Sequence, residues 1–352
     1  MKGKTIKIIH RWLAFVLGLF IVFQVTSGSI AQESRLLMQW TSPDHYKVDA
    51  NSEPSGPSVI KKRMNELEPE FNIAHVMVPP PNRESTAYIL MGGRNPENLH
   101  ESSLFVNYDQ YKQEILDEHP LRGSGWIGTM TVLHRWIILG DAGFYIVFIL
   151  GLATVLMCIS GIYLFFKTRK TAKHLPLINR LHRSLGFLAS FFLIVTSLSG
   201  IAMSYVHWED REDNLSVFAN MMKTDHMHIA KNIVDPDSAL ETARSVIPNK
   251  YHLAAYSYAG SHSPNYWFAF FDKQMFRQDV VIEGMTGEVL GIYAAGKTLK
   301  GDGIRNYLLP IHSGKYFGRI GGVLMSFFGF IVMLWLLSGL TIYFDNKKRQ
   351  IA

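Results

Sequence analysis

The chain has 352 residues, of which 48% are hydrophobic, with a formal net charge of +6 and a single cysteine. One cysteine excludes an internal disulfide and a cysteine-rich metal or iron–sulfur site, and the absence of a C-x-x-C-H sequence excludes covalent c-type haem. A mean hydropathy just above zero is too apolar for an ordinary soluble protein and too polar for a helical bundle alone, so membrane spans and polar segments must alternate.

Four apolar stretches approach or exceed the roughly 20 residues that a helix needs to cross a membrane. They are Trp12–Ala31, Phe144–Phe166, Leu185–Val206 and Ile320–Phe344. The first stretch follows a basic start and precedes small residues, which also describes a cleaved signal peptide. Its length favours a retained helix, and so does a copy of it at 182–200, which cannot be a signal.

Basic residues gather in the segments that flank one end of each predicted span. Residues 1–11 hold four Lys and Arg and no acid, residues 167–183 hold six and no acid, and residues 345–352 hold three and one Asp. The positive-inside rule places all three segments, and both termini, in the cytoplasm. The basic pI therefore reflects membrane topology and not nucleic-acid binding.

This topology divides the chain into eight segments. Transmembrane helices are expected at 1–31, 134–166, 184–206 and 312–344, the second and fourth with outer extensions; a cytoplasmic loop at 167–183 and a cytoplasmic tail at 345–352; and outer domains at 32–133 and 207–311. Sequence patterning predicts that each outer domain is small and α+β.

Each outer domain should contain one helix followed by strands. In the first domain the helix is expected at Ser58–Leu67, and in the second at Asp237–Val246 with a cap from Asp235-Pro236-Asp237. Alternating apolar residues predict the strands near Ile73–Val78, Thr86–Met91, Leu104–Tyr108, Leu253–Tyr258, Tyr266–Phe271 and Asp279–Glu283.

The chain contains two copies of one pattern. His10 and His182 each begin the same phrase: His-Arg, then Leu and Phe at matching offsets, then Ser-Gly at the same distance. The outer segments VNYDQYKQEIL (106–116) and VVIEGMTGEVL (280–290) align as well. Because both halves start in the cytoplasm, the repeat is parallel, about an axis along the membrane normal. We expect a four-helix bundle in which equivalent residues meet near that axis.

Four histidines stand at repeat-related positions: His10 and His182 at inner helix ends, His134 and His312 at outer ends. A single histidine at a helix end is usually structural, because imidazole tolerates the headgroup region. Two imidazoles facing each other across a bundle suit a b-type haem, with one neutral histidine on each side of the iron. The four residues are therefore candidate ligands of two haems, one at each membrane face.

Nearby glycines and arginines fit this reading. Glycine would let a flat macrocycle approach a helix closely. The glycines are Gly18, Gly28, Gly140, Gly143, Gly186, Gly200, Gly318, Gly321 and Gly322. Arg11, Arg135 and Arg183 adjoin the histidines and could neutralise haem propionates, although the positive-inside pattern and headgroup contacts explain them at least as well.

Three features leave alternatives open. His134 precedes Phe144 by about 15 Å of helix, so its haem would lie at the outer surface unless the chain kinks. His207 is a lower-ranked alternative for an outer ligand. Met221-Met222 and His226-Met227-His228 could bind a soft metal such as copper, but a solvated loop with scattered methionines is the simpler reading.

Several short motifs recur in a fixed order along nearly the whole chain. They are the helix starts His10-Arg11, Leu133-His134-Arg135 and Leu181-His182-Arg183; Ile311-His312-Ser313-Gly314 with its following glycines; the helix ends Ser-Gly-Ile-Tyr and Ser-Gly-Leu-Thr; and the turn Gly-Met-Thr-Gly-Glu-Val-Leu. With these motifs the sequence resembles the PepSY-associated transmembrane family. The resemblance implies a bacterial inner-membrane protein with four helices and two periplasmic PepSY-like domains.

The resemblance also implies a chemistry. The family is associated with iron uptake, and its best understood members are ferric-siderophore reductases that hold two b haems in the membrane. The match carries haem ligation onto His10, His182, His134 and His312. Some relatives carry a fused flavin reductase domain, whereas this sequence shows no flavin or nicotinamide motif, so the electron donor should be a separate molecule.

The expected function is therefore an inner-membrane haem b reductase that passes electrons from a quinol or a cytosolic reductase to a periplasmic ferric siderophore or other iron(III) chelate. One alternative is a membrane-anchored PepSY module that binds or inhibits a periplasmic protein without a cofactor. Another is a copper or iron transporter that uses the Met/His loop. The lack of acidic or polar residues in mid-helix argues against an ion path.

Overall fold

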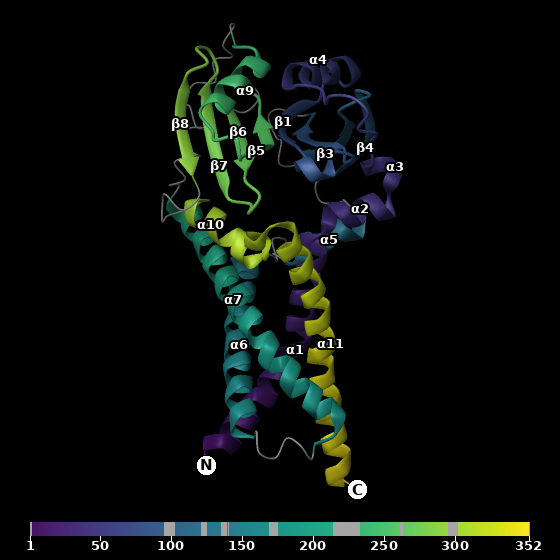
Figure 1. The fold of residues 1–352 in the computed structure, drawn as a ribbon, viewed down its shortest axis with the longest axis vertical. Coiled ribbons are helices and arrows are strands. Elements are labelled where there is room, and N and C mark those ends of the chain that lie inside the picture. Colours follow the sequence, from purple (N-terminus) through teal and green to yellow (C-terminus); the bar gives the residue numbers. More distant parts are fainter. Residues whose placement is uncertain are drawn as a thin grey trace. The chain divides into compact units, whose positions relative to one another are not determined.

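The computed structural model describes residues 2–94, 103–120, 125–134, 139, 141–168, 175–213, 233–260, 263–294 and 302–351. The chain divides into two compact units, each drawn in Figure 1. The helical unit is built from Met1–Glu33, Met130–Trp208 and Leu308–Ala352, and the sheet unit from Ser34–Thr129 and Glu209–Tyr307.

Four long helices form the helical unit (Figure 1): α1 (Lys2–Gln32), α6 (Asp141–Lys167), α7 (Leu177–Asp213) and α11 (Gly318–Ile351). Each contains a stretch that is long and apolar enough to cross a membrane: Lys4–Gln32, Ala142–Lys167, Leu177–Tyr205 and Lys315–Phe344. The four predicted spans are thus confirmed.

The inner faces of these helices share one core. Helix α1 packs against both α6 and α11. The core includes Ile21, Met157, Cys158, Leu193 and Trp335. Large apolar side chains on the other faces are exposed, as expected of helices that contact lipid.

Two shorter helices carry the outer histidines. We expect outer extensions that continue into the spans at 134–166 and 312–344. His134 is the last described residue of α5 (Gly125–His134), and residues 135–138 lie outside the described part of the chain. In the second half, α10 (Asp302–His312) ends before α11 begins, and a short 3-10 turn, η4 (Lys315–Phe317), lies between them. There Gly314 and Gly318 adopt φ of 71° and 69°, which glycine tolerates without strain. His312 therefore ends its own helix instead of extending the fourth span.

The sheet unit holds one antiparallel sheet in the order β4-β3-β2-β1-β5-β6-β7-β8. Its strands are β1 (Asn72–Met77), β2 (Tyr88–Gly93), β3 (Ser103–Asp109), β4 (Glu114–Pro120), β5 (His252–Ser257), β6 (Asn265–Phe271), β7 (Arg277–Glu283) and β8 (Val289–Ala294). All six predicted strands are present, and β4 and β8 are added at the two edges. Strand β1 pairs with β5, so the strands of the two expected outer domains form one continuous sheet.

Helices α4 (Pro57–Leu67) and α9 (Pro236–Ser245) match the two predicted helices, and Asp235 caps α9 as predicted. The remaining short elements are α2 (Ser34–Thr41), α3 (Pro43–Tyr46) and η1 (Pro81–Arg83). Both α4 and α9 bury their apolar faces in the main core of the sheet unit, for example through Ile60 and Leu240.

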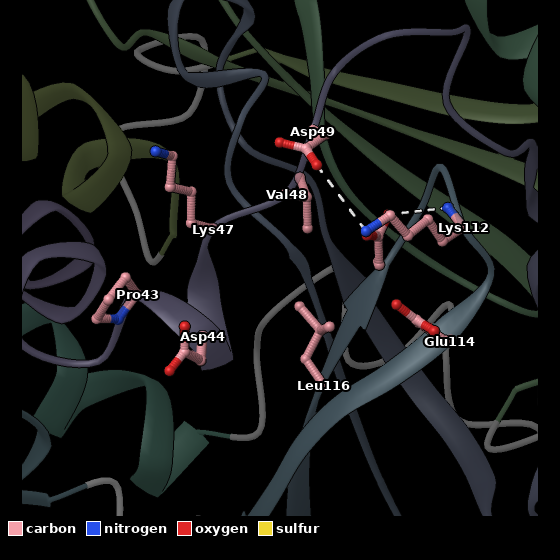
Figure 2. Close-up of a pocket in the computed structure, with 9 residues that line it drawn as sticks. Pro43, Asp44, Lys47, Val48, Asp49, Lys112, Glu114 and Leu116 are labelled. Carbon is pink, nitrogen blue, oxygen red and sulfur yellow. Dashed lines mark hydrogen bonds and ion pairs between the residues drawn. The ribbon is translucent and has the colours of Figure 1, made fainter.

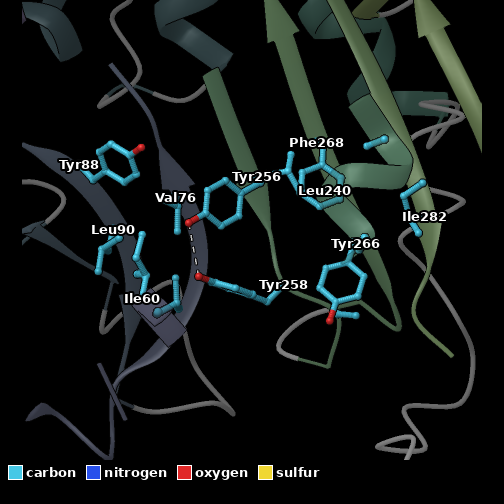
Figure 3. Packing of buried hydrophobic residues seen from close by; sticks show 14 of the residues in the cluster. Ile60, Val76, Tyr88, Leu90, Leu240, Tyr256, Tyr258, Tyr266, Phe268 and Ile282 are labelled. Carbon is cyan, nitrogen blue, oxygen red and sulfur yellow. Dashed lines mark hydrogen bonds between the residues drawn. The ribbon is translucent and has the colours of Figure 1, made fainter. Parts of the chain in front are cut away.

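That core crosses the junction between the two halves of the sequence. Figure 3 shows Tyr256 and Tyr258, from the second half, beside Ile60, Val76 and Leu90 of the first. The Tyr258 hydroxyl donates to the Pro57 carbonyl oxygen over 2.8 Å. Neither half could bury these side chains alone, so the two halves fold as one unit.

Candidate functional site

Each of the four predicted histidines contacts a Ser-Gly pair on another helix of the helical unit. The pairs are His10 with Ser160-Gly161 of α6, His134 with Ser27-Gly28 of α1, His182 with Ser338-Gly339 of α11, and His312 with Ser199-Gly200 of α7. The same two residue types therefore surround all four imidazoles. We call each of these four arrangements a histidine seat.

The glycine of each seat leaves the space that the imidazole fills. A Cβ atom placed on Gly28 would lie 2.6 Å from Cε1 of His134, and one on Gly339 would lie 3.0 Å from Cε1 of His182. The corresponding distances are 3.1 Å from Gly200 to His312 and 3.3 Å from Gly161 to His10. A larger residue at any of these positions would press on the ring, so glycine permits the close approach of imidazole and helix.

The two outer seats bind the imidazole Nδ1 through a backbone carbonyl. Nδ1 of His134 lies 2.9 Å from the Gln24 carbonyl oxygen, and Nδ1 of His312 lies 2.9 Å from that of Thr196. A carbonyl only accepts, so each Nδ1 must carry the proton. In a neutral ring this leaves the lone pair on Nε2, the arrangement of a histidine prepared to bind a metal.

The two inner seats use the serine hydroxyl instead. Nδ1 of His10 lies 2.8 Å from Ser160 Oγ and 3.2 Å from the Met157 carbonyl, to which the Ser160 hydroxyl donates over 2.8 Å. Nδ1 of His182 lies 3.1 Å from Ser338 Oγ, whose hydroxyl donates to the Trp335 carbonyl over 2.6 Å. Because each hydroxyl proton is already donated, its oxygen accepts from Nδ1, and Nε2 again keeps the lone pair.

The rings of the two outer histidines are neighbours with tilted planes, and the inner histidines lie close enough to interact. The ring centroids of His134 and His312 are 6.4 Å apart, with the ring planes at 45°. His10 lies close enough to His182 to act on it electrostatically. Each expected pair is therefore brought together at its own end of the helical unit.

Trp335 supports the inner histidine of α7. Its ring stacks on His182 with centroids 5.2 Å apart, and its Nε1 donates to the His182 carbonyl over 2.7 Å. A Cβ at Gly186 would lie 2.6 Å from the same indole, so Trp335 packs directly against this glycine.

The arginines that were candidates to neutralise haem propionates contact protein groups. Arg183 donates to carbonyl oxygens at the end of α6, including that of Phe165 over 3.1 Å, and the Arg11 guanidinium lies 5.2 Å from the centre of the Tyr343 ring. These contacts agree with a structural role for both arginines. Arg135, Gly140, the side chain of His207 and the Met/His loop (221–228) lie outside the described residues.

The paired histidine nitrogens fit a cofactor, such as a haem, that itself supplies most of the ligands of its metal. Among the described residues there is no group of three or more His, Cys, Asp and Glu that could hold a bare metal ion. The paired histidines offer two nitrogens at each end. Metal–imidazole bonds are about 2 Å long, so one metal shared by two Nε2 atoms would set the ring centroids about 6 Å apart. The outer pair has this spacing, which fits a haem with two axial histidines.

The sheet unit carries two shallow cavities of a different character. One, of about 410 Å³, is lined by Lys47, Asp49, Lys112 and Glu114 among others, and Lys112 pairs with Asp49 at 3.9 Å (Figure 2). A second, of about 490 Å³, is lined by residues of both halves, such as Arg244. Neither contains one of the four histidines.

Comparison with known proteins places the whole chain in one group. A comparison with curated proteins found no match. The family described as the PepSY-associated TM region matches residues 8–346, nearly the full length, and this match includes all four histidine seats. The chain is therefore a member of the PepSY-associated transmembrane family.

Proposed function

We propose that this protein is a haem b reductase of the bacterial inner membrane that passes electrons across the membrane to a periplasmic ferric siderophore or other iron(III) chelate. The N- and C-termini would be cytoplasmic and the sheet unit periplasmic. The electron donor would be a separate molecule, a quinol or a cytosolic reductase. The observation that carries the proposal is the set of four histidine seats, each with Nδ1 protonated and glycine against the ring.

In this proposal the two pairs of histidines hold two haems, His10 and His182 the inner one, His134 and His312 the outer one. When bound, each haem supplies a one-electron carrier based on iron. The seats fix the direction of each imidazole through the Nδ1 hydrogen bond, and the apolar walls of the bundle exclude water. Such chemistry needs no general acid or base, because reduction alone weakens the hold of hard oxygen ligands on iron.

The proposal includes a duplicated architecture. Each half supplies one inner histidine, one outer histidine and two Ser-Gly pairs, and each half contributes four strands and one helix, α4 or α9, to the main core of the sheet unit. A parallel repeat explains why the four seats share one chemistry. It also explains why the aligned segments 106–116 and 280–290 both form a hairpin at a sheet edge.

The reductase activity is tested by oxidising the reduced protein. The purified protein, reduced with dithionite and freed of excess reductant without oxygen, is mixed with ferric hydroxamate, catecholate and citrate chelates. We expect at least one chelate to restore the oxidised visible spectrum while an Fe²⁺-specific dye captures the released iron. The variant His134→Ala should lose this reaction, whereas His45→Ala, at an exposed histidine of α3, should keep it.

The opposite result would be a reduced protein that oxygen reoxidises but no ferric chelate does. That outcome would leave a haem protein with another acceptor and would contradict the proposed substrate class. A protein without cofactor would instead favour the alternative of a membrane-anchored module that binds a periplasmic protein.

A further inference from the structure

The inner and outer histidine seats differ in the atom that accepts the Nδ1 proton. In the outer seats the nearest acceptor is the backbone carbonyl, at 2.9 Å in both, and the serine oxygens lie farther away, at 3.4 Å for Ser27 and 3.2 Å for Ser199. In the inner seats the nearest acceptor is the serine oxygen, at 2.8 Å for Ser160 and 3.1 Å for Ser338. The outer serines also donate to those carbonyls, Ser27 to Gln24 and Ser199 to Thr196, each over 3.1 Å, so the inner and outer seats differ in which oxygen lies nearer to Nδ1.

The inner serines stand between the imidazole and the carbonyl. The Ser160 hydroxyl donates to the Met157 carbonyl and accepts from His10, while the carbonyl itself is 3.2 Å from Nδ1. The Ser338 hydroxyl is bonded to the Trp335 carbonyl in the same way. Ser160 is buried and Ser338 is partly buried. Each carbonyl is therefore partly satisfied by the serine and is not the main partner of the ring.

This difference has a chemical consequence for a ligating imidazole. An amide carbonyl oxygen carries more negative charge than a hydroxyl oxygen, so it draws the Nδ1 proton away more strongly. A ring whose proton is drawn away is a more electron-donating ligand, which favours the oxidised metal and lowers its reduction potential. A serine in this position weakens that effect.

We propose that Ser160 and Ser338 are positioning residues that keep the reduction potential of the inner haem higher than a direct carbonyl bond would set it. The inference rests on the proposed function, because it assigns these serines a role toward the haem held by His10 and His182. It goes beyond that function by distinguishing the second partners of the inner ligands from those of the outer ligands.

The test is a redox titration of the purified holoprotein, followed in the visible spectrum, for five single variants. Ser160→Ala and Ser338→Ala remove the inner hydroxyls, and each should shift the midpoint potential of one haem downward while the other haem is unchanged. Ser190→Ala and Ser326→Ala are controls in α7 and α11, because these hydroxyls donate to the Gly186 and Gly322 carbonyls of their own helices. They should leave both potentials unchanged. Ser160→Thr, which restores the hydroxyl, should restore the potential.

The possible results distinguish a failure of this inference from a failure of the proposed function. Unchanged or raised potentials in both inner variants, or equal shifts in all four serine variants, would overturn the inference while leaving the haem sites intact. If Ser160→Ala loses one haem, recovery in Ser160→Thr supports the role of the hydroxyl, and failure of the threonine variant to recover it counts against that role. A parent protein without haem would overturn the proposed function and the inference together.

Discussion

At the scale of single residues, each of the four histidines is held by a Ser-Gly pair of another helix. The repeated phrases reveal His10, His182, His134 and His312 because each recurs at a fixed distance from a Ser-Gly pair. The phrases do not reveal that each Ser-Gly pair serves a histidine of another helix, because that contact depends on how the helices pack. Of the glycines named for a macrocycle, Gly28 and Gly200 lie against an imidazole, whereas Gly161 and Gly339 of the other two seats were not predicted.

The glycine seats give a direct prediction. The change Gly28→Ala places a methyl group 2.6 Å from the His134 ring, so the ring must move and the outer haem should be lost, leaving about one haem per chain in place of two. Val16→Ala on the same helix is the control, because the Val16 side chain is exposed. Haem content is measured per chain by pyridine haemochrome. Equal haem content in both variants would show that the seat does not position the ligand.

At the scale of elements, local patterns predicted the inner strands of the sheet but missed its edges. Strand β4 carries Asp and Glu in place of aromatic residues, and its Glu118 pairs with Arg94 across the edge. Strand β8 contains Gly291, which lowers its strand propensity. The pairing of β1 with β5 joins residues far apart in sequence, and no local pattern encodes such a contact.

The cap of α9 gives the prediction at this scale. The Asp235 carboxylate accepts from the backbone N–H groups of Asp237 and Ser238 at 2.9 and 3.2 Å, and the Ser58 hydroxyl of α4 donates to it over 2.8 Å. The bond from Ser58, followed by those from the two amides, lowers the pKa of Asp235. A carboxyl whose pKa is lowered by folding stabilises the fold at pH values above about 3.9, the ordinary pKa of aspartate. This stabilisation is lost as the pH falls through the lowered pKa.

Replacing the cap should therefore loosen α9 at neutral pH. We expect Asp235→Ala to destabilise the helix start by about 1 kcal/mol, which is roughly a fivefold faster amide exchange across α9. Hydrogen–deuterium exchange with mass spectrometry measures this effect. Asp235→Asn is the matched control, since its side-chain oxygen can still accept from the two amides. Identical exchange in the alanine variant and the parent would refute the role of the cap.

At the scale of the whole molecule, α1 belongs to the bundle. It packs against α6 and α11, carries His10, and supplies Ser27 and Gly28 to the seat of His134. Cleavage near residue 31, as of a signal peptide, would remove one ligand and the support of another. We therefore predict that the mature membrane protein retains residues 1–31. Mass spectrometry of the intact purified protein decides this, and a mass that lacks the first span would exclude both proposed haem sites as drawn.

The central claim is that two b haems are held by the four histidine seats, and the visible spectrum of the purified protein tests it most directly. The oxidised and dithionite-reduced spectra, with a pyridine haemochrome assay, are recorded for the parent and for His10→Ala, His182→Ala, His134→Ala, His312→Ala and the control His45→Ala. We expect low-spin b haem at about two per chain, reduced in each of the four variants and unchanged in the control. A colourless protein from cells supplied with a haem precursor would contradict the account.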